Sequence, residues 1–128
     1  MPEENLMTNK EETETKTKSR LIEASMKYFK KMGYKIRQKK VAVEGFSGII
    51  RKFDLIVQKG RKEQGVWIRD WNRTIGVNII INLDKASEDV GLSNPIIIGG
   101  KFSDHAKAYA NRRKIMLLTK RQILRSLR

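Results

Sequence analysis

A carboxylate within an apolar, strand-like segment is the residue of this chain best suited to chemistry. Asp54 stands inside Phe53–Val57, and a carboxylate in such a place can hold a divalent cation such as Mg²⁺. The next strand-like segment carries Trp67 and Arg69. Tryptophan offers no oxygen ligand, and arginine does not readily release its proton. Because side chains alternate along a strand, Trp67 and Arg69 share one face.

Two further carboxylates are candidates to supplement Asp54 at a metal. Glu23 would approach from a preceding helix, and together with Asp54 it makes a thin magnesium site. Asp70 would lie on the strand face opposite Trp67 and Arg69, so it would need a β-bulge to turn inward. From the sequence alone, Asp54 could bind a metal with either of these two carboxylates or with neither.

Other catalytic or ligand-binding patterns are weak. His105 is the only histidine, and we expect it on the surface of a helix. The chain has no cysteine, which excludes disulfides and thiolate metal sites and favours an intracellular protein. The run Gly99-Gly100-Lys101 lacks the spacing of a P-loop. Lys101 and Ser103 in this strand-to-helix turn could still hold one phosphate.

The charge of the chain points to polyanionic partners. Its net charge is +14, although glutamates outnumber lysines in residues 1–18. Such an excess attracts nucleic acid, with an anionic membrane or an acidic protein as the alternatives. No apolar run approaches the roughly 20 residues that span a bilayer. We therefore expect a cytoplasmic protein with a nucleic-acid partner, and we expect no membrane partner.

The candidate nucleic-acid contacts are basic clusters together with one tryptophan near a strand end. Lys35, Arg37 and Lys39 are expected to share one face of an early strand. Arg112 and Arg113 could instead complement the dipole at a helix C-terminus. Trp67 could stack on a base or fill the core. The full set is Lys35, Arg37, Lys39, Lys40, Arg51, Lys52, Arg61, Lys62, Arg69, Trp71, Arg73, Lys101, Arg112 and Arg113.

Hydrophobic periodicity divides the chain into a tail and a folded region. The polar residues 1–18 are predicted to be a disordered tail, and residues 19–128 a nucleic-acid-binding domain. A helix capped by Ser19 carries a stripe of Leu21, Ile22, Met26, Phe29 and Met32 and ends at Gly33. The strands expected next are 34–43, 53–57 and 66–71, with a hairpin-like loop over 60–65.

The second half alternates helices and strands. Residues 76–90 fit a strand or a helix, and we choose the helix. A strand at 96–98, a helix from Ser103 to Arg113, a buried strand at 115–118 and a helix capped by Thr119 with Ile123 and Leu124 inward complete the order. This alternation predicts an α/β fold, with a central mixed β-sheet flanked by helices on both faces.

This order resembles the PD-(D/E)XK restriction-endonuclease-like family, in its Mrr-type and archaeal Holliday-junction-resolvase branch, over about residues 20–125. The resemblance is carried by Glu23, Gly33-Tyr34, Gly48, Asp54-Leu55-Ile56-Val57, the strand at 66–70, and Lys101-Phe102-Ser103-Asp104-His105-Ala106 with Tyr109-Ala110, leading to Ile115–Leu118. It implies a restriction-endonuclease-like fold. In active members an Asp and a Glu hold Mg²⁺ and a Lys positions water.

At the matching positions this chain keeps Asp54 but has Trp67 for the acidic residue and Arg69 for the lysine. The resemblance also implies that Arg69 lies on the strand adjacent to Asp54, where the two could form an ion pair. The resemblance thus implies a degenerate active site, with Asp54, Arg69 and Glu23 vestigial. No cofactor is expected, apart from Mg²⁺ if nuclease activity is retained.

We expect a catalytically inactive nuclease-fold protein that binds nucleic acid through its basic surface. Structured RNA is favoured over DNA, and ribosomal RNA is included, as for a ribosomal component of an archaeon. One alternative is an active Mg²⁺-dependent restriction-type or structure-specific DNA endonuclease. Another is a DNA-repair or chromatin scaffold that does not cut. Family members often dimerise, but no self-complementary apolar face is identifiable.

Overall fold

The computed structural model describes residues 20–128, so the predicted tail and the Ser19 cap lie outside the described residues. The order of elements agrees with the sequence prediction. The elements are a helix over residues 20–31, β1 (Lys35–Glu44), β2 (Ile50–Lys59), β3 (Lys62–Arg69), α2 (Val77–Asp89), β4 (Ile96–Gly99), α3 (Asp104–Arg113), β5 (Met116–Thr119) and α4 (Lys120–Ser126).

The five strands form one mixed sheet in which spatial order equals sequence order, β1-β2-β3-β4-β5. The pairs β1/β2 and β2/β3 are antiparallel. The pairs β3/β4 and β4/β5 are parallel, and the crossovers between them contain α2 and α3. The carboxyl ends of β3, β4 and β5 therefore meet at one edge, where Arg69 pairs with Gly99 and Gly99 with Thr119.

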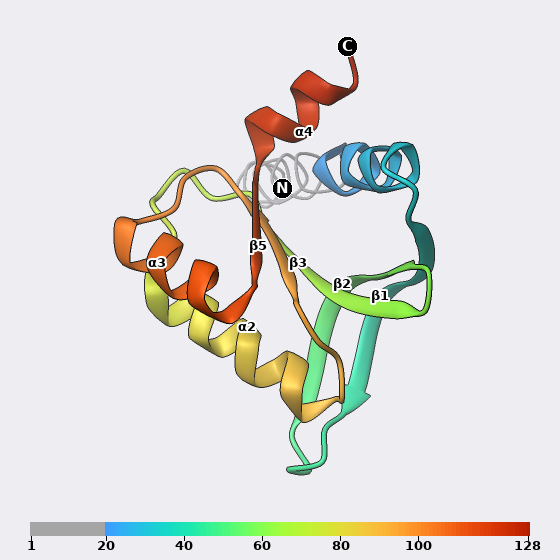
Figure 1. Ribbon diagram of the computed structural model, residues 1–128, viewed down its shortest axis with the longest axis vertical. Helices are drawn as coiled ribbons and strands as arrows, with labels where there is room; N and C mark the ends of the chain where they lie inside the picture. The colour runs from blue at the N-terminus through green and yellow to red at the C-terminus, as the bar shows by residue number, and fades with distance from the viewer. Residues whose placement is uncertain (1–19) are drawn as a thin grey trace, which may run out of the picture.

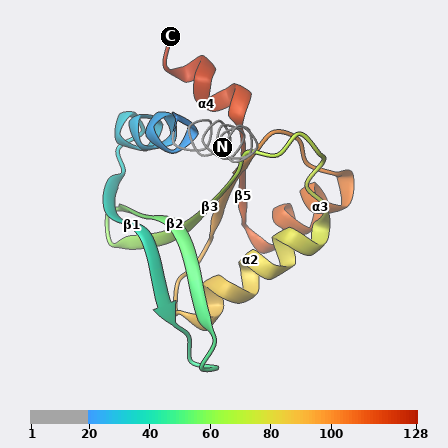
Figure 2. The same ribbon diagram turned by 180° about the vertical axis from the view of Figure 1, so that it is seen from behind.

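Helices cover both faces of the sheet, as predicted, and each face has its own core (Figures 1 and 2). The helix at residues 20–31 and α4 share one core with the sheet, which includes Leu21, Phe29 and Ile123. Helices α2 and α3 share the other core, which includes Ile80 and Ala106. No helix in the described part of the chain is long and apolar enough to cross a membrane.

Three local sequence signals act as predicted at element ends. Gly33 takes a positive φ of 92° after the first helix, a conformation that costs glycine little. The Ser103 hydroxyl accepts a hydrogen bond from the Ala106 amide and caps α3. Thr119 forms a capping box with Gln122 at the start of α4.

The predicted hairpin is present, but its loop is shorter than the expected residues 60–65. Strand β2 continues to Lys59, β3 begins at Lys62, and Lys59 pairs with Lys62 across a two-residue turn. Gly60 takes the positive φ that such tight hairpin turns require. The start of β3 was not predicted because Glu63 and Gln64 are polar. Gln64 is nevertheless buried, and its side-chain amide donates to the Asn94 carbonyl at 2.6 Å.

Three expected core side chains are exposed instead. Met32 follows the last helical residue, so it lies off the buried stripe. Leu124 is exposed because α4 buries Ile123 and turns its next residue outward. Met116 is the first residue of β5, which is an edge strand of the sheet. Among the described residues no further strand lies beside β5, and the Met116 side chain is exposed.

Candidate functional site

Asp54 lies where β2 and β3 separate. The last paired residues of these two strands are Leu55 and Val66. Next to this pair, the Asp54 carboxylate, in place of a backbone carbonyl of β2, accepts a hydrogen bond from the backbone of β3. Asp54 Oδ2 accepts a hydrogen bond from the Ile68 amide at 2.7 Å. Phe53 and Leu55 belong to opposite cores, although residues two apart in a regular strand share a face. The backbone of β2 therefore twists at Asp54, and the Asp54 carboxylate connects β2 to β3 where their backbones no longer pair.

Arg69 completes the ion pair expected from the sequence. Its Nη1 lies 3.4 Å from Asp54 Oδ2 and also donates to the Ile68 carbonyl at 3.2 Å. Burial lowers the pKa of Arg69, and the neighbouring carboxylate of Asp54 opposes that shift. Because the pKa of a guanidinium starts far above neutrality, Arg69 stays charged and is held by Asp54.

Trp67 is a half-buried residue of the second core. Its ring packs against that core, and its Nε1 donates to the Lys52 carbonyl at 2.8 Å. The Arg69 guanidinium lies over the ring, 4.5 Å from its centroid. These contacts agree with the core-filling interpretation of Trp67 and leave its indole nitrogen satisfied within the protein.

Asp70 and Glu23 do not join Asp54. The Asp70 carboxylate pairs with Lys120 of α4 at 3.1 Å, and α4 packs on the sheet face opposite the Trp67 core. Glu23 is exposed on the helix of residues 20–31, which covers that same opposite face. Across residues 20–128, no group of three or more histidine, cysteine or acidic side chains could hold a metal ion. The motif positions therefore offer one carboxylate, Asp54, which a backbone amide and a guanidinium already contact.

The segment after β3 continues the stack of rings and guanidinium groups. The guanidinium carbon of Arg73, two residues after Trp71, lies 4.3 Å from the centroid of the Trp71 ring. The guanidinium carbon of Arg69, two residues before Trp71, lies 5.9 Å from the same centroid. We call Trp67, Arg69, Trp71 and Arg73 the tryptophan–arginine stack. An isolated parallel bridge between Ile75 and Phe102 then attaches this segment to the turn before α3.

Comparison with known families identifies the fold. The Mrr_cat family, described as Restriction endonuclease, matches residues 15–127. The chain belongs to this family. Its fold is also that of the crystal structure of AF1548, a protein of unknown function, with a TM-score of 0.73 and 17% sequence identity over 84% of this chain. The match spans 66% of that protein's length. No curated protein matches the chain.

Several predicted nucleic-acid contacts of this Mrr-type chain are committed to internal ion pairs. Arg51 Nε lies 2.8 Å from Asp89 Oδ2. Arg113 contacts Asp84 at 2.9 Å and Glu88 at 2.6 Å, which ties α3 to α2. The predicted contacts that are exposed and form no ion pair within residues 20–128 are Lys35, Lys39, Lys40, Lys52, Arg61, Lys62, Arg73, Lys101 and Arg112.

The prediction that Lys35, Arg37 and Lys39 share a face is wrong. The register of β1 against β2 shifts between Ile36 and Gln38, so Arg37 is an extra residue of a β-bulge. Lys35 pairs with Gln58, whereas Lys39 pairs with Leu55 of the first core. The bulge reverses the alternation that the prediction assumed.

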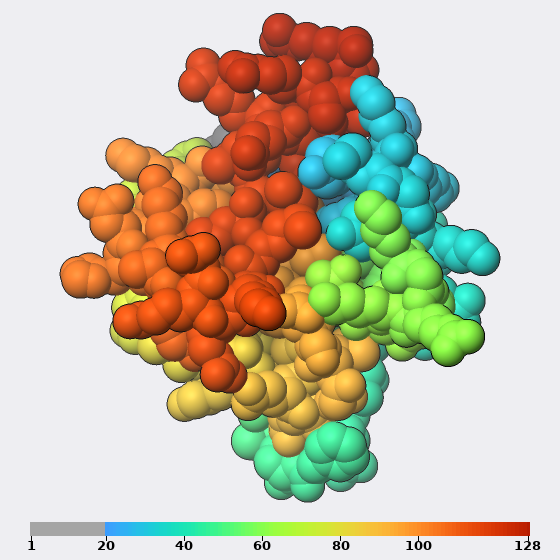
Figure 3. Space-filling view, in the orientation of Figure 1, coloured from blue at the N-terminus to red at the C-terminus, as the bar shows by residue number. Residues whose placement is uncertain are grey.

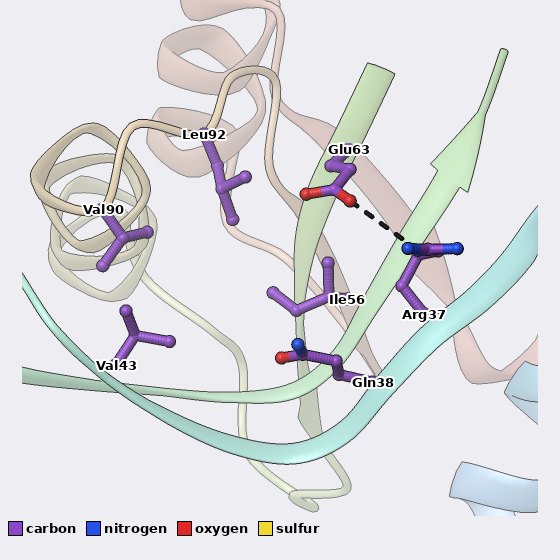
Figure 4. A pocket seen from close by; sticks show the side chains of 7 residues that line it. All are labelled: Arg37, Gln38, Val43, Ile56, Glu63, Val90 and Leu92. Atoms are coloured by element: carbon purple, nitrogen blue, oxygen red, sulfur yellow. Dashed lines mark ion pairs between the residues drawn. The ribbon is translucent and has the colours of Figure 1, made fainter. Parts of the chain in front are cut away.

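The bulge also borders a pocket that the sequence did not indicate (Figure 4). Its volume is about 230 Å³, and Arg37 and Glu63 form an ion pair of 3.7 Å at its rim. The remaining lining residues are Gln38, Val43, Ile56, Val90 and Leu92. Nothing in the sequence marked this pocket, because its walls come from β1, β2, β3 and the turn after α2. His105 is exposed on α3, as expected.

Proposed function

We propose that this Mrr-type domain binds nucleic acid without cleaving it. The observation that carries the proposal is the Asp54 carboxylate, which accepts the Ile68 amide and pairs with Arg69. In an active site of this kind, carboxylates must be free to ligate Mg²⁺ near the scissile phosphate. Here a guanidinium and a backbone amide hold the carboxylate, and Trp67 stands where the second acidic ligand is expected.

The basic surface supports binding as the retained activity. The exposed, unpaired cations spread over the β1–β2–β3 hairpins, the β3–α2 segment and α3, so no single base-reading element stands out. Spread-out cations contact phosphates and give affinity without sequence specificity. Structured RNA, including ribosomal RNA in the cytoplasm, is the partner we favour, because a constitutive RNA-bound role fits the small size, the extreme charge and the altered motif.

Family membership and the retained Asp54 support a second candidate, an active Mg²⁺-dependent endonuclease. A cleavage assay separates the two. Structured RNA, supercoiled plasmid and four-way DNA junctions would be incubated with the protein and Mg²⁺ or Mn²⁺, with Asp54→Ala as control. We expect no metal-dependent product. Cleavage that disappears in Asp54→Ala would establish the nuclease and overturn our proposal.

Binding is tested separately on the same substrates, without metal, by fluorescence anisotropy. We expect tight binding at low salt, with RNA competing better than duplex DNA of equal length. A preference for duplex DNA without cutting would indicate the repair or chromatin scaffold instead. Sedimentation of the endogenous protein would then test the ribosomal role, because co-migration with one subunit should disappear after RNase digestion.

A further inference from the structure

The segment that follows β3 is held at both ends, and this fixes the position of Trp71. Its first end continues β3, and at the other end the Ile75 amide donates to the Lys101 carbonyl at 2.8 Å. The Ser103 amide donates back to the Ile75 carbonyl at 3.0 Å. A Cβ at Gly100 would lie 3.2 Å from the Trp71 carbonyl oxygen, so the two segments approach closely at this point.

The two arginines beside Trp71 differ in what their N–H groups do. Arg69 Nη1 bonds to Asp54 and to the Ile68 carbonyl. Arg73 is exposed, and within residues 20–128 it forms no hydrogen bond or ion pair. Its guanidinium carbon lies 4.3 Å from the centroid of the Trp71 ring, a cation–π contact made by an exposed side chain. Arg73 can therefore move from the Trp71 ring to a phosphate, which uncovers the ring face that it now occupies.

Charge around Trp71 indicates what kind of ligand fits. Arg69, Arg73 and Lys101 all belong to the backbone segments that meet at this edge of the sheet, and the Lys101 side chain is exposed. Asp54 is occupied by Arg69, and the neighbouring Asp70 is paired with Lys120 on the opposite face. Cations whose neighbouring carboxylates on β2 and β3 are already paired attract an anion, and a half-exposed indole beside them offers a surface on which a base can stack.

We propose that Trp71, Arg73 and Lys101 form a subsite for an unpaired nucleotide. The base of a bulge, loop or strand end takes the place of the Arg73 guanidinium on the Trp71 ring, and its flanking phosphates contact Arg73 and Lys101. This inference rests on the proposed function, because it names the class of nucleic acid that the basic surface holds. Duplex regions would lie on the exposed cations of the hairpins, and the subsite would select molecules that offer an unstacked base. Stacking is tolerant of base identity, so no sequence preference is required.

The test uses two RNA duplexes that differ in one base. Both carry a single-nucleotide bulge, and in the second the bulged nucleotide is an abasic ribose, so backbone and charge are equal. We expect the protein to bind the base-containing duplex about tenfold more tightly, as is typical for one stacked base. Anisotropy of a distal fluorophore gives both dissociation constants.

Variants show whether Trp71 provides the preference. Trp71→Leu keeps an apolar side chain but removes the ring, so the preference should vanish while the affinity for the abasic duplex remains. Trp71→Phe should retain part of the preference. Arg61→Gln, a matched control in the β2–β3 turn, should weaken both duplexes equally. Circular dichroism and thermal unfolding verify that each variant is folded.

Tryptophan emission gives a readout on the unaltered protein. The base-containing duplex should quench the emission more strongly than the abasic duplex does. Equal affinities and equal quenching would overturn the subsite and leave nucleic-acid binding intact. Failure to bind either duplex at low salt would overturn the subsite together with the proposed function.

Discussion

At the scale of single residues, a catalytic role and a structural role for Asp54 predict opposite effects on stability. Catalytic carboxylates commonly reduce stability, because they are kept free of internal partners for the sake of function. In this structure Asp54 has the partners of a structural residue, a backbone amide at 2.7 Å and a guanidinium at 3.4 Å. The two roles therefore differ in the sign of their effect on the free energy of unfolding.

We predict that Asp54→Ala lowers the free energy of unfolding by about 1–3 kcal/mol, because it leaves the Ile68 amide without its acceptor and Arg69 without its carboxylate. Asp54→Asn should cost less, since the amide oxygen can still accept from Ile68. Urea unfolding followed by tryptophan emission measures both values. A variant more stable than the parent would show that Asp54 is kept for a functional role instead.

Gly65 is a second residue whose identity the packing dictates. A Cβ at this buried position would lie 2.6 Å from two ring carbons of Phe53. We predict that Gly65→Ala lowers the free energy of unfolding by about 1–3 kcal/mol through overpacking. Adding Phe53→Leu should cost less than the sum of the two single substitutions, because the smaller side chain makes room. Strict additivity in thermal unfolding of the four proteins would contradict this contact.

At the scale of elements, one carboxylate fastens the β1–β2 turn to the end of α2. Asp89 Oδ1 accepts from the Ser47 amide at 2.9 Å, and Oδ2 accepts from the Ser47 hydroxyl at 2.6 Å and from Arg51 Nε at 2.8 Å. The Phe46 amide donates to the Asp89 carbonyl at 2.8 Å. The turn protrudes from the molecule and exposes 87% of Phe46 (Figure 3).

These contacts make the turn sensitive to acid. Hydrogen bonds from the Ser47 hydroxyl, from Arg51 and from the Ser47 amide lower the pKa of Asp89 from 3.8 to about 2. The folded state thus favours the charged carboxylate more than the unfolded state does. The contribution of Asp89 to stability is complete above pH 3.8 and is lost as the pH falls through about 2.

We predict that Ser47→Ala and Arg51→Gln each raise the pKa of Asp89 towards its ordinary value. Carboxyl-carbon NMR across the acid range measures the titration directly. Glu44→Gln, which changes an exposed acid at the end of β1, should leave the Asp89 titration unchanged. An Asp89 midpoint near 3.8 in the unaltered protein would contradict the hydrogen bonds described here.

Much of this architecture was predictable because its signals are local. Ser103 and Thr119 are helix caps, and the apolar run at Ile96–Ile98 marks a central strand whatever surrounds it. The Asp54–Arg69 pair was predictable because the family resemblance places the two residues on adjacent strands. The bulge at Arg37 and the Asp89 contacts were not, because they depend on the register of β1 and on the position of α2.

At the scale of the whole molecule, internal ion pairs increase the dominance of positive charge. Of the nine acidic side chains in residues 20–128, six lie in ion pairs with lysine or arginine. The three acidic side chains outside these pairs are Glu23, Glu44 and Asp104. A polyanion that approaches the surface therefore meets mostly unpaired lysine and arginine.

We predict that nucleic-acid affinity falls steeply with salt. A protein that neutralises about six to ten phosphates loses roughly 10³–10⁵-fold in affinity between about 50 and 200 mM salt. Anisotropy titrations at several salt concentrations give the slope. Replacing one exposed contact, as in Lys52→Ala, should reduce the slope by about one, whereas the Arg113 position, held by two carboxylates, should change it less. An affinity insensitive to salt would contradict the electrostatic mechanism.

The strand order has a consequence for how the chain folds as it is made. Because each strand pairs only with its neighbours in sequence, every new strand finds its template already synthesised when it leaves the ribosome. The first core does not follow this order. Leu21 and Phe29, near the beginning of the chain, share that core with Leu118 and Ile123, near its end. Part of the apolar face of the helix at residues 20–31 therefore stays uncovered until β5 and α4 have been synthesised.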